Sequence, residues 1–147
     1  DAVAKGGPTG LWQMMPNTAK HYGLRIGGKN DGRLSAIEST DAALAYLAFL
    51  QKTFGNWQTS IMAYNAGDSR LRTSLKKQGL SRADADNGLP AGLAPHTYAY
   101  VRKIEALTCL FLSPGDYGVT LPLETAFDPL QSATSISTAA EKHNGGG

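Results

Sequence analysis

The sequence has little of several features that commonly reveal what class a protein belongs to. Cys109 is the only cysteine in 147 residues, so no disulfide can form within the chain and the redox compartment cannot be inferred. The formal net charge of +2 is too small to indicate a nucleic-acid-binding protein. No apolar run reaches the roughly 18 residues that a membrane-spanning helix needs. The length instead fits one domain that can bury a substantial core.

A metal-binding pattern is also missing from the sequence. The three histidines, His21, His96 and His143, do not have the spacing of a zinc site. We therefore expect no metal ion, and no motif indicates another cofactor. His96 is better interpreted as a hydrogen-bonding residue near a helix cap.

The sequence does contain regularly placed signals for the start and the end of helices. A short helix is expected over residues 9–14, and a second helix is expected to begin at Pro16. The longest helix is expected to begin at a cap among residues 39–41 and to end before Gly55. The remaining predicted elements are helices over residues 56–66, 68–79 and 96–112, loops over 24–34 and 80–95, and a candidate strand over 119–123. This pattern predicts an all-α domain followed by an irregular tail.

One segment with residues suited to ligand chemistry is GLWQMMPNTA at 10–19, which combines an aromatic ring, an amide and two thioethers. Saccharide sites use such mixtures, because apolar groups pack on the faces of sugar rings and amides hydrogen-bond to hydroxyl and acetamido groups. Gln13 and Met15 are the candidate binding residues. Taken alone, the segment is explained better by Trp12, Met14 and Met15 in the core, with Gln13 in solvent.

A second such segment is MAYNAG at residues 62–67, at the end of a predicted helix. Tyr64 offers a flat apolar ring with a polar tip, which suits a sugar, although a core role explains it equally well. Asn65 is better explained by a hydrogen bond to its own backbone at the helix end. Gly67 can adopt a positive φ, which lets the backbone approach a ligand closely.

Five segments together resemble the lytic transglycosylases, lysozyme-like enzymes of bacterial cell walls. They occur in the family's order and at its approximate spacing: GLWQMMPNTA, YGL at 22–24, STDAALAYLAFLQKTFGNW at 39–57, AYNAG at 63–67 and TYAYVRKIEAL at 97–107. The resemblance is nearer to the membrane-bound type D subgroup, because DYGVTLP at 116–122 resembles the segment after that subgroup's catalytic domain. It covers roughly residues 1–122.

The resemblance implies a fold, a substrate and a set of residues that contact it. The fold would be the all-α, goose-lysozyme-type fold, with a catalytic domain over residues 1–114 that lacks its first helix. Residues 115–147 would form a partly extended or disordered C-terminal extension. The implied substrate is a peptidoglycan glycan strand, cleaved between N-acetylmuramic acid and N-acetylglucosamine without water to give a 1,6-anhydro product. The implied substrate-binding residues are Gln13, Met15, Ala63, Tyr64, Asn65 and Tyr100.

The family's mechanism needs one glutamate, which protonates the leaving oxygen and then removes the proton of the muramic acid C6 hydroxyl. By the resemblance this glutamate lies just before Asp1, so we expect the present chain alone to be inactive. Glu124, within LETAFDP at 123–129, imitates the motif and is the alternative acid if the domain is circularly permuted. Pro122 argues against Glu124, because proline restricts the helix that would lead into it.

Three positions depart from the family's pattern. Ala4 stands where the family usually has a serine that helps to hold the glutamate, His96 replaces a second acid, and DGRLSA at 31–36 replaces a more highly charged stretch. The first two departures keep open a non-catalytic alternative, in which the domain is a glycan-binding or scaffold module of the cell envelope or of a phage particle. Hydrolysis, as in a related lysozyme, is a further alternative.

The resemblance also carries expectations about location and partners. We expect the protein in the periplasm or cell envelope of a bacterium, with a phage particle as the second choice. Peptidoglycan strands are the expected partner, nucleic acid is not, and the protein is expected to be a monomer. Any membrane association would come through a region before Asp1.

Overall fold

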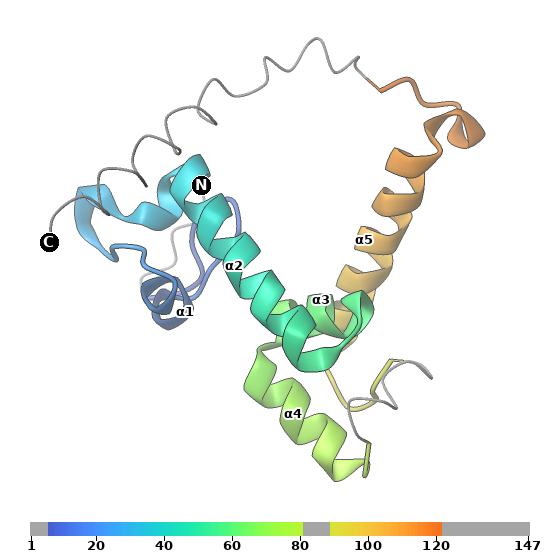
Figure 1. Ribbon diagram of the computed structural model, residues 1–147, viewed down its shortest axis with the longest axis horizontal. Coiled ribbons are helices and arrows are strands. Elements are labelled where there is room, and N and C mark those ends of the chain that lie inside the picture. The colour runs from blue at the N-terminus through green and yellow to red at the C-terminus, as the bar shows by residue number, and fades with distance from the viewer. Residues whose placement is uncertain (1–5, 81–88, 122–147) are drawn as a thin grey trace, which may run out of the picture. The chain divides into compact units, whose positions relative to one another are not determined.

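The computed structural model describes residues 6–80 and 89–121 (Figure 1). Its helices are α1 (Pro16–His21), α2 (Ala36–Phe54), α3 (Trp57–Ala66), α4 (Asp68–Lys77) and α5 (Pro95–Leu112), with short 3-10 helices η1 (Gly28–Asn30), η2 (Gly32–Leu34) and η4 (Pro114–Tyr117). Neither described range contains a strand, so the predicted all-α class is confirmed. The chain forms two compact units, which divide between Ile104 and Glu105.

The segment before α1 is a loop, and the helix expected over residues 9–14 was a wrong prediction. Thr9 and Met14 form an isolated antiparallel bridge, in which the Thr9 N–H donates to the Met14 carbonyl at 3.3 Å. Gly10 and Gln13 have positive φ values of 79° and 48°, which lie outside the α-helical region. The chain turns back here and then enters α1 at Pro16, because the fixed φ of proline suits a first helical residue.

The longer helices begin and end at residues whose chemistry explains the boundary. Ser35 caps α2, where its Oγ accepts from the Glu38 N–H at 3.2 Å, so this helix begins earlier than the cap predicted among residues 39–41. Glu38 lies in the first turn, where its charge complements the helix dipole. The predicted end of α2 is confirmed, since Gly55 adopts the left-handed conformation with φ 87°. Asn56 caps α3 as predicted.

Two other expectations concern the connecting segments. The predicted loop over residues 24–34 contains the two short 3-10 helices η1 and η2. Residues 119–121 are not in a strand, and the rest of the candidate strand lies outside the described residues. None of the helices in the described ranges combines the length and the hydropathy that crossing a bilayer requires.

Two clusters of buried side chains form the core of the first unit. The larger cluster joins α2, α3, α4 and the start of α5 through Leu50, Phe54, Met62, Ala63, Leu71, Leu75 and Val101. The smaller cluster joins the loop, α1 and α2 through Met14, Ala19, Leu24, Ala42 and Ala43. Helix α2 therefore contributes to both clusters, and α3 packs against it (Figure 1). Ala42 and Leu50 lie about 12 Å apart along this helix, which fixes the spacing of the clusters.

Candidate functional site

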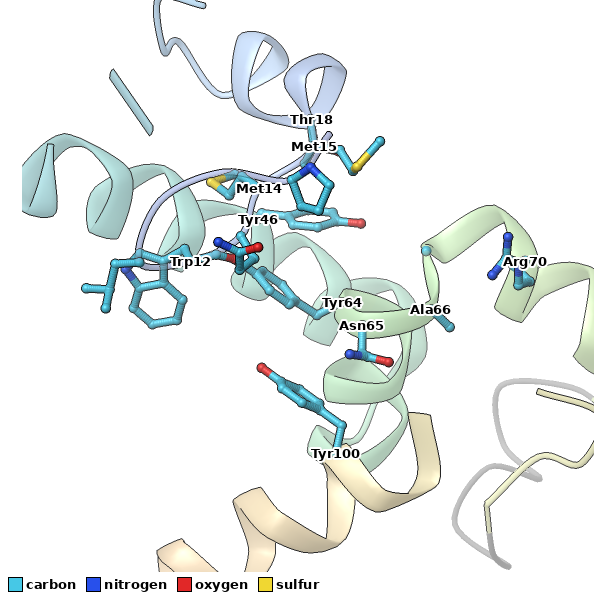
Figure 2. A pocket seen from close by; sticks show the side chains of 14 residues that line it. Trp12, Met14, Met15, Thr18, Tyr46, Tyr64, Asn65, Ala66, Arg70 and Tyr100 are labelled. Atoms are coloured by element: carbon cyan, nitrogen blue, oxygen red, sulfur yellow. The ribbon is translucent and has the colours of Figure 1, made fainter. Parts of the chain in front are cut away.

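A pocket of about 790 Å³ lies in the first unit and is lined by the loop before α1 and by helices α1 to α5. This volume falls in the range of roughly 300–1,000 Å³ that is typical of small-ligand sites. Figure 2 shows Trp12 and Met15 on the loop, Tyr46 on α2, Tyr64 and Asn65 on α3, and Tyr100 on α5. The lining is mostly aromatic and apolar, and its one charged side chain is Arg70 on α4.

Gln13 reaches the pocket from a strained loop. It is the only non-glycine residue with a positive φ in the described part of the chain. Its side-chain Nε2 donates to the Gly10 carbonyl at 2.7 Å, and its backbone N–H donates to the same oxygen at 3.2 Å. A non-glycine residue with a positive φ raises the free energy of the folded state by roughly 1–3 kcal/mol. Such a conformation persists only where the surrounding structure fixes it. The loop must therefore be held from outside.

The outside support comes from the segment at η2. Gly10 packs directly against the backbone of Arg33. A Cβ added at position 10 would lie only 1.7 Å from the Arg33 carbonyl oxygen. The Arg33 Nη1 donates to the Gly7 carbonyl at 2.8 Å and to the Met14 carbonyl at 3.2 Å. Arg33 thus holds the loop on both sides of Gln13, and position 10 accepts only glycine.

Arg33 is in turn fixed by Asp31. The two side chains are 5% and 8% exposed, and they form a bidentate pair, with Nη2 to Oδ2 at 2.7 Å and Nε to Oδ1 at 3.0 Å. The hydrogen bonds from Arg33 hold the pKa of Asp31 well below its usual range, and Asp31 raises the pKa of Arg33. The Gly27 N–H also donates to Asp31 at 3.0 Å. Both members of this buried pair are charged at every physiological pH. Their hydrogen bonds offset the free-energy cost of removing the two charges from water.

A second set of hydrogen bonds ties the loop to the helices. The Trp12 Nε1–H donates to Thr40 Oγ1 on α2 at 2.8 Å. The Tyr64 hydroxyl on α3 donates to the Trp12 carbonyl at 2.9 Å, and the two rings meet edge to face with centroids 6.5 Å apart. Trp12 therefore links the loop to both α2 and α3.

The tyrosines of the pocket remain neutral at physiological pH. Burial raises the pKa of Tyr46 to about 12, with Asp68 as a smaller cause, and burial also raises the pKa values of Tyr64 and Tyr100. The Tyr46 and Tyr64 rings pack at a centroid distance of 5.4 Å. Neutral phenols keep a donor hydrogen and an apolar face, so this wall of the pocket suits a ligand that is itself largely uncharged.

The structure brings five of the six predicted site residues together. Gln13, Met15, Tyr64, Asn65 and Tyr100 all line the pocket, whereas Ala63 is fully buried in the larger core cluster and does not line it. Met15 is 51% exposed, which corrects the interpretation of this residue as core. The Asn65 Oδ1 is buried without a hydrogen-bond partner in the described part of the chain, so the expected bond to its own backbone is not formed.

Sequence reasoning missed several residues of the pocket, among them Tyr46 and Arg70. Tyr46 lies on α2 between Ala43 and Leu50, so its helical spacing resembled that of the core stripe. Arg70 follows Asp68 in the first turn of α4, where an outward cation is ordinary. No sequence pattern at either position indicated a binding role, because the packing of each helix in the fold determines that these side chains face the pocket.

No carboxylate lines the pocket within the described residues. Glu38 lies in the first turn of α2, and Glu105 belongs to the second unit. The alternative acid, Glu124, and the departure at Ala4 both lie outside the described residues. His96 is exposed in the first turn of α5, and its side chain forms no hydrogen bond with another described residue.

The family of the chain follows from its match to known sequences. The family model described as Transglycosylase SLT domain matches residues 1–87, which is more than half of the chain. The chain therefore belongs to the transglycosylase SLT domain family, and the predicted resemblance to the lytic transglycosylases is confirmed.

The chain is also similar to individual relatives, two of which are named as lytic murein transglycosylases. The chain is similar to membrane-bound lytic murein transglycosylase D from Escherichia coli (strain K12) and from Escherichia coli O6:H1 (strain CFT073), at 33% identity over 122 residues in each case. This alignment covers 82% of the chain but only 27% of each relative. A protein of Alteromonas sp. (strain M-1), named for tributyltin chloride resistance, is 42% identical over 68 residues, which cover 46% of the chain and 33% of that protein.

Proposed function

We propose that the pocket binds a glycan strand of peptidoglycan, and that the protein takes part in cleaving that strand as a lytic transglycosylase. One observation carries the proposal. Residues from two distant segments, Gln13 and Met15 on the loop and Tyr64 and Asn65 on α3, line a single pocket together with Tyr100. Their spacing in the sequence resembles the family's pattern, and membership of the family supports the same substrate class.

The chemistry of the lining supports a saccharide with acetamido groups. The rings of Trp12, Tyr64 and Tyr100 offer apolar surfaces on which sugar rings pack. The Asn65 Oδ1 is an acceptor with no donor among the described residues, which an acetamido N–H would satisfy at little cost. Gln13 adds an amide that is exposed to the pocket and held in one backbone conformation.

We propose for the reaction the path that the family resemblance implies. A glutamic acid protonates the oxygen of the β-1,4 bond between N-acetylmuramic acid and N-acetylglucosamine. The resulting carboxylate then removes the proton of the C6 hydroxyl, whose oxygen closes a 1,6-anhydro ring on C1, so that no water is consumed. The family resemblance places this acid before the segment matched by residues 1–13, so we assign it to a position upstream of Asp1.

Digestion of purified sacculi tests this assignment. A chain extended with its natural upstream sequence is expected to release 1,6-anhydromuropeptides, identified by mass spectrometry, whereas residues 1–147 release none. The matched control replaces the upstream glutamate by glutamine in the extended chain, which should abolish release. Turnover by residues 1–147 that is lost in Glu124→Gln would instead assign the acid to Glu124. Products with a reducing-end muramic acid would indicate hydrolysis.

A second candidate function is a non-catalytic glycan-binding or scaffold module of the cell envelope or of a phage particle. Ala4 at the place of a family serine and His96 at the place of a family acid favour it. In this case the extended chain binds sacculi but releases no product at all. The two functions share the pocket, so binding alone does not distinguish them.

The location that we propose is the bacterial cell envelope, where peptidoglycan lies. The names of two relatives describe membrane-bound murein enzymes, which supports this compartment. Fractionation of cells that produce the full-length protein with an epitope tag is expected to place it in the envelope fraction, and recovery only from the cytoplasm would contradict the proposal.

A further inference from the structure

The backbone of the pocket loop is held on both sides of Gln13. On one side the Trp12 carbonyl accepts a hydrogen bond from the Tyr64 hydroxyl at 2.9 Å. On the other side the Met14 carbonyl accepts one from Arg33 Nη1 at 3.2 Å. Each peptide group is planar, so a chain that is fixed on both sides of a residue leaves that residue little freedom to change its dihedral angles. The positive φ of Gln13 therefore depends on both hydrogen bonds.

The two residues that hold the loop stand in different relations to the pocket. Tyr64 lines it and can contact a ligand directly, whereas Arg33 is 5% exposed and does not line it. Arg33 can therefore affect a ligand only through the loop. Besides the Met14 carbonyl it binds the Gly7 carbonyl, where Nη1 donates at 2.8 Å. It thus fixes the backbone that carries Gln13 without occupying any of the space that a ligand needs.

Arg33 is anchored to the start of α2. It lies in η2, which ends directly before Ser35, the capping residue of that helix. The Gly32 N–H donates to the Arg25 carbonyl at 2.9 Å, which fixes the short helix from the other side. Helix α2 also carries Tyr46, which lines the pocket. The position of the loop is therefore set relative to a helix that forms part of the same pocket.

We propose that Arg33 is a positioning residue for glycan binding, which fixes the loop so that the Gln13 amide and the Met15 thioether face the ligand before it arrives. The inference rests on the proposed function, because it requires the pocket to bind a glycan through these two side chains. Without Arg33 the strained conformation at Gln13 is only one of those that the loop adopts, and the ligand selects it from the others. The apparent dissociation constant then rises by the factor by which the population of that conformation falls.

The strain at Gln13 sets the size of the expected effect. Strain of the kind that a positive φ causes in a non-glycine residue corresponds to a factor of about 5 to 150 in an equilibrium constant. When Arg33 no longer opposes the relaxation of the loop, the population of the binding conformation falls by up to this factor. The affinity for a glycan should fall in the same proportion.

Calorimetry on residues 1–147 measures this effect with a soluble oligosaccharide of alternating N-acetylglucosamine and N-acetylmuramic acid. Arg33→Met is expected to raise the dissociation constant by about 5- to 150-fold, at a temperature where circular dichroism shows the variant to be folded. Leu71→Ala is the matched control, because it also lowers stability strongly but lies in the core cluster that contains no residue of the loop. Its dissociation constant should stay within about twofold of that of the unsubstituted chain.

The outcomes of this experiment separate the inference from the proposed function. An unchanged dissociation constant in Arg33→Met, or an equal rise in Leu71→Ala, would overturn the inference alone. Failure of the unsubstituted chain to bind the oligosaccharide would overturn the proposed function as well.

Arg33→Lys provides the test if Arg33→Met does not fold. Lysine keeps a positive charge beside Asp31, but it lacks the planar fork with which Arg33 contacts Asp31 and the loop carbonyls together. We expect Arg33→Lys to fold and to raise the dissociation constant by about fivefold or more. A folded Arg33→Lys variant with unchanged affinity would overturn the inference.

A double-mutant cycle on binding tests the route by which Arg33 acts. If Arg33 acts through Gln13, then Arg33→Lys should change the dissociation constant by a smaller factor in the Gln13→Ala background than in the unsubstituted chain. A purely structural role of Arg33 would not produce this coupling. Equal factors in the two backgrounds would show that Arg33 does not position Gln13.

Discussion

The loop that carries Gln13 and Met15 is held by charged and polar groups, whereas the helix that carries Tyr64 and Asn65 rests on an apolar cluster. Arg33 and Asp31 hold the loop through hydrogen bonds to the carbonyls of residues on both sides of Gln13. Behind α3, Met62 and Ala63 pack against fully buried aliphatic side chains of α2 and α4. One side of the pocket thus depends on electrostatics, and the other depends on hydrophobic burial.

The difference shows what each kind of support provides. Apolar packing holds a regular helix, whose side chains follow from its register. Hydrogen bonds from Arg33 can hold a non-helical loop, including the positive φ of Gln13, because they satisfy carbonyls that no secondary structure pairs. Each support also has its own sensitivity, so variants on the two sides should behave differently.

Arg33→Met is expected to lower the stability of the protein more than any other substitution considered. This substitution leaves the Asp31 carboxylate buried without its cation, and it leaves the Gly7 and Met14 carbonyls without their donor. We expect the free energy of unfolding to fall by about 3–5 kcal/mol, measured by urea denaturation. The control is Arg25→Met, an exposed arginine that should change stability by about 0.5 kcal/mol or less.

A double-mutant cycle tests whether the ion pair causes this loss. Asp31→Asn should lower the free energy of unfolding less in the Arg33→Met background than in the unsubstituted chain. In the unsubstituted chain it leaves the buried Arg33 cation without its partner, whereas in the Arg33→Met background that cation is absent. Additive effects of the two substitutions would contradict the coupled pair.

Leu71→Ala probes the apolar side of the comparison. Leu71 is fully buried in the cluster behind α3, so its truncation should cost about 2–5 kcal/mol. Unlike Arg33→Met, it should leave the amide chemical shift of Gln13 unchanged in the folded protein. Leu34→Ala, at a residue that is 49% exposed, is the control with a small expected loss. A displaced Gln13 signal in Leu71→Ala would mean that the two sides are not independent.

Acid should weaken the loop side selectively. The pKa of Asp31 lies below its usual value of 3.8 in the folded protein, so its stabilisation is complete above that value and is lost as the pH falls below it. The urea midpoint should therefore decrease between about pH 5 and pH 2 more steeply in the unsubstituted chain than in the Arg33→Met, Asp31→Asn double variant. If the urea midpoint changed equally with pH in the two proteins, the ion pair would not be the cause of the acid sensitivity.

The smallest predicted effect is that of Tyr64→Phe. The substitution removes the hydroxyl that donates to the Trp12 carbonyl at 2.9 Å and so links α3 to the loop. A loss of about 1 kcal/mol is expected in thermal unfolding. Tyr100→Phe is the matched control, since the Tyr100 hydroxyl makes no hydrogen bond within the described part of the chain. Equal losses in both variants would show that the link contributes nothing measurable.

The same contrast explains what could be predicted from the sequence. The bounds of α3 follow from local signals, namely the cap at Asn56 and the glycine after its end, so they were predictable. The loop was predicted wrongly as a helix, because the conformation of Gln13 depends on contacts with Arg33 and Gly10, and the partnership with Arg33 leaves no local pattern.

The candidate site was predictable to a similar extent. The joint position of Gln13, Met15, Tyr64 and Tyr100 was implied by the family resemblance and not by any single motif. Tyr46 and Arg70 were missed, because only the packing of α2 and α4 turns them towards the pocket. The burial of Ala63 follows from its place on the inner face of α3, which its spacing alone did not distinguish from the pocket face.

The measurement that tests the central claim most directly is a nuclear magnetic resonance titration of residues 1–147 with an oligosaccharide of alternating N-acetylglucosamine and N-acetylmuramic acid. We predict saturable chemical shift changes at Gln13, the Met15 methyl, Tyr64, Asn65 and Tyr100. A cellulose oligosaccharide of equal length, which lacks acetamido groups, should bind more weakly at the same residues. Shifts confined to other parts of the chain, or equal binding of both sugars, would contradict the assignment of this pocket to peptidoglycan.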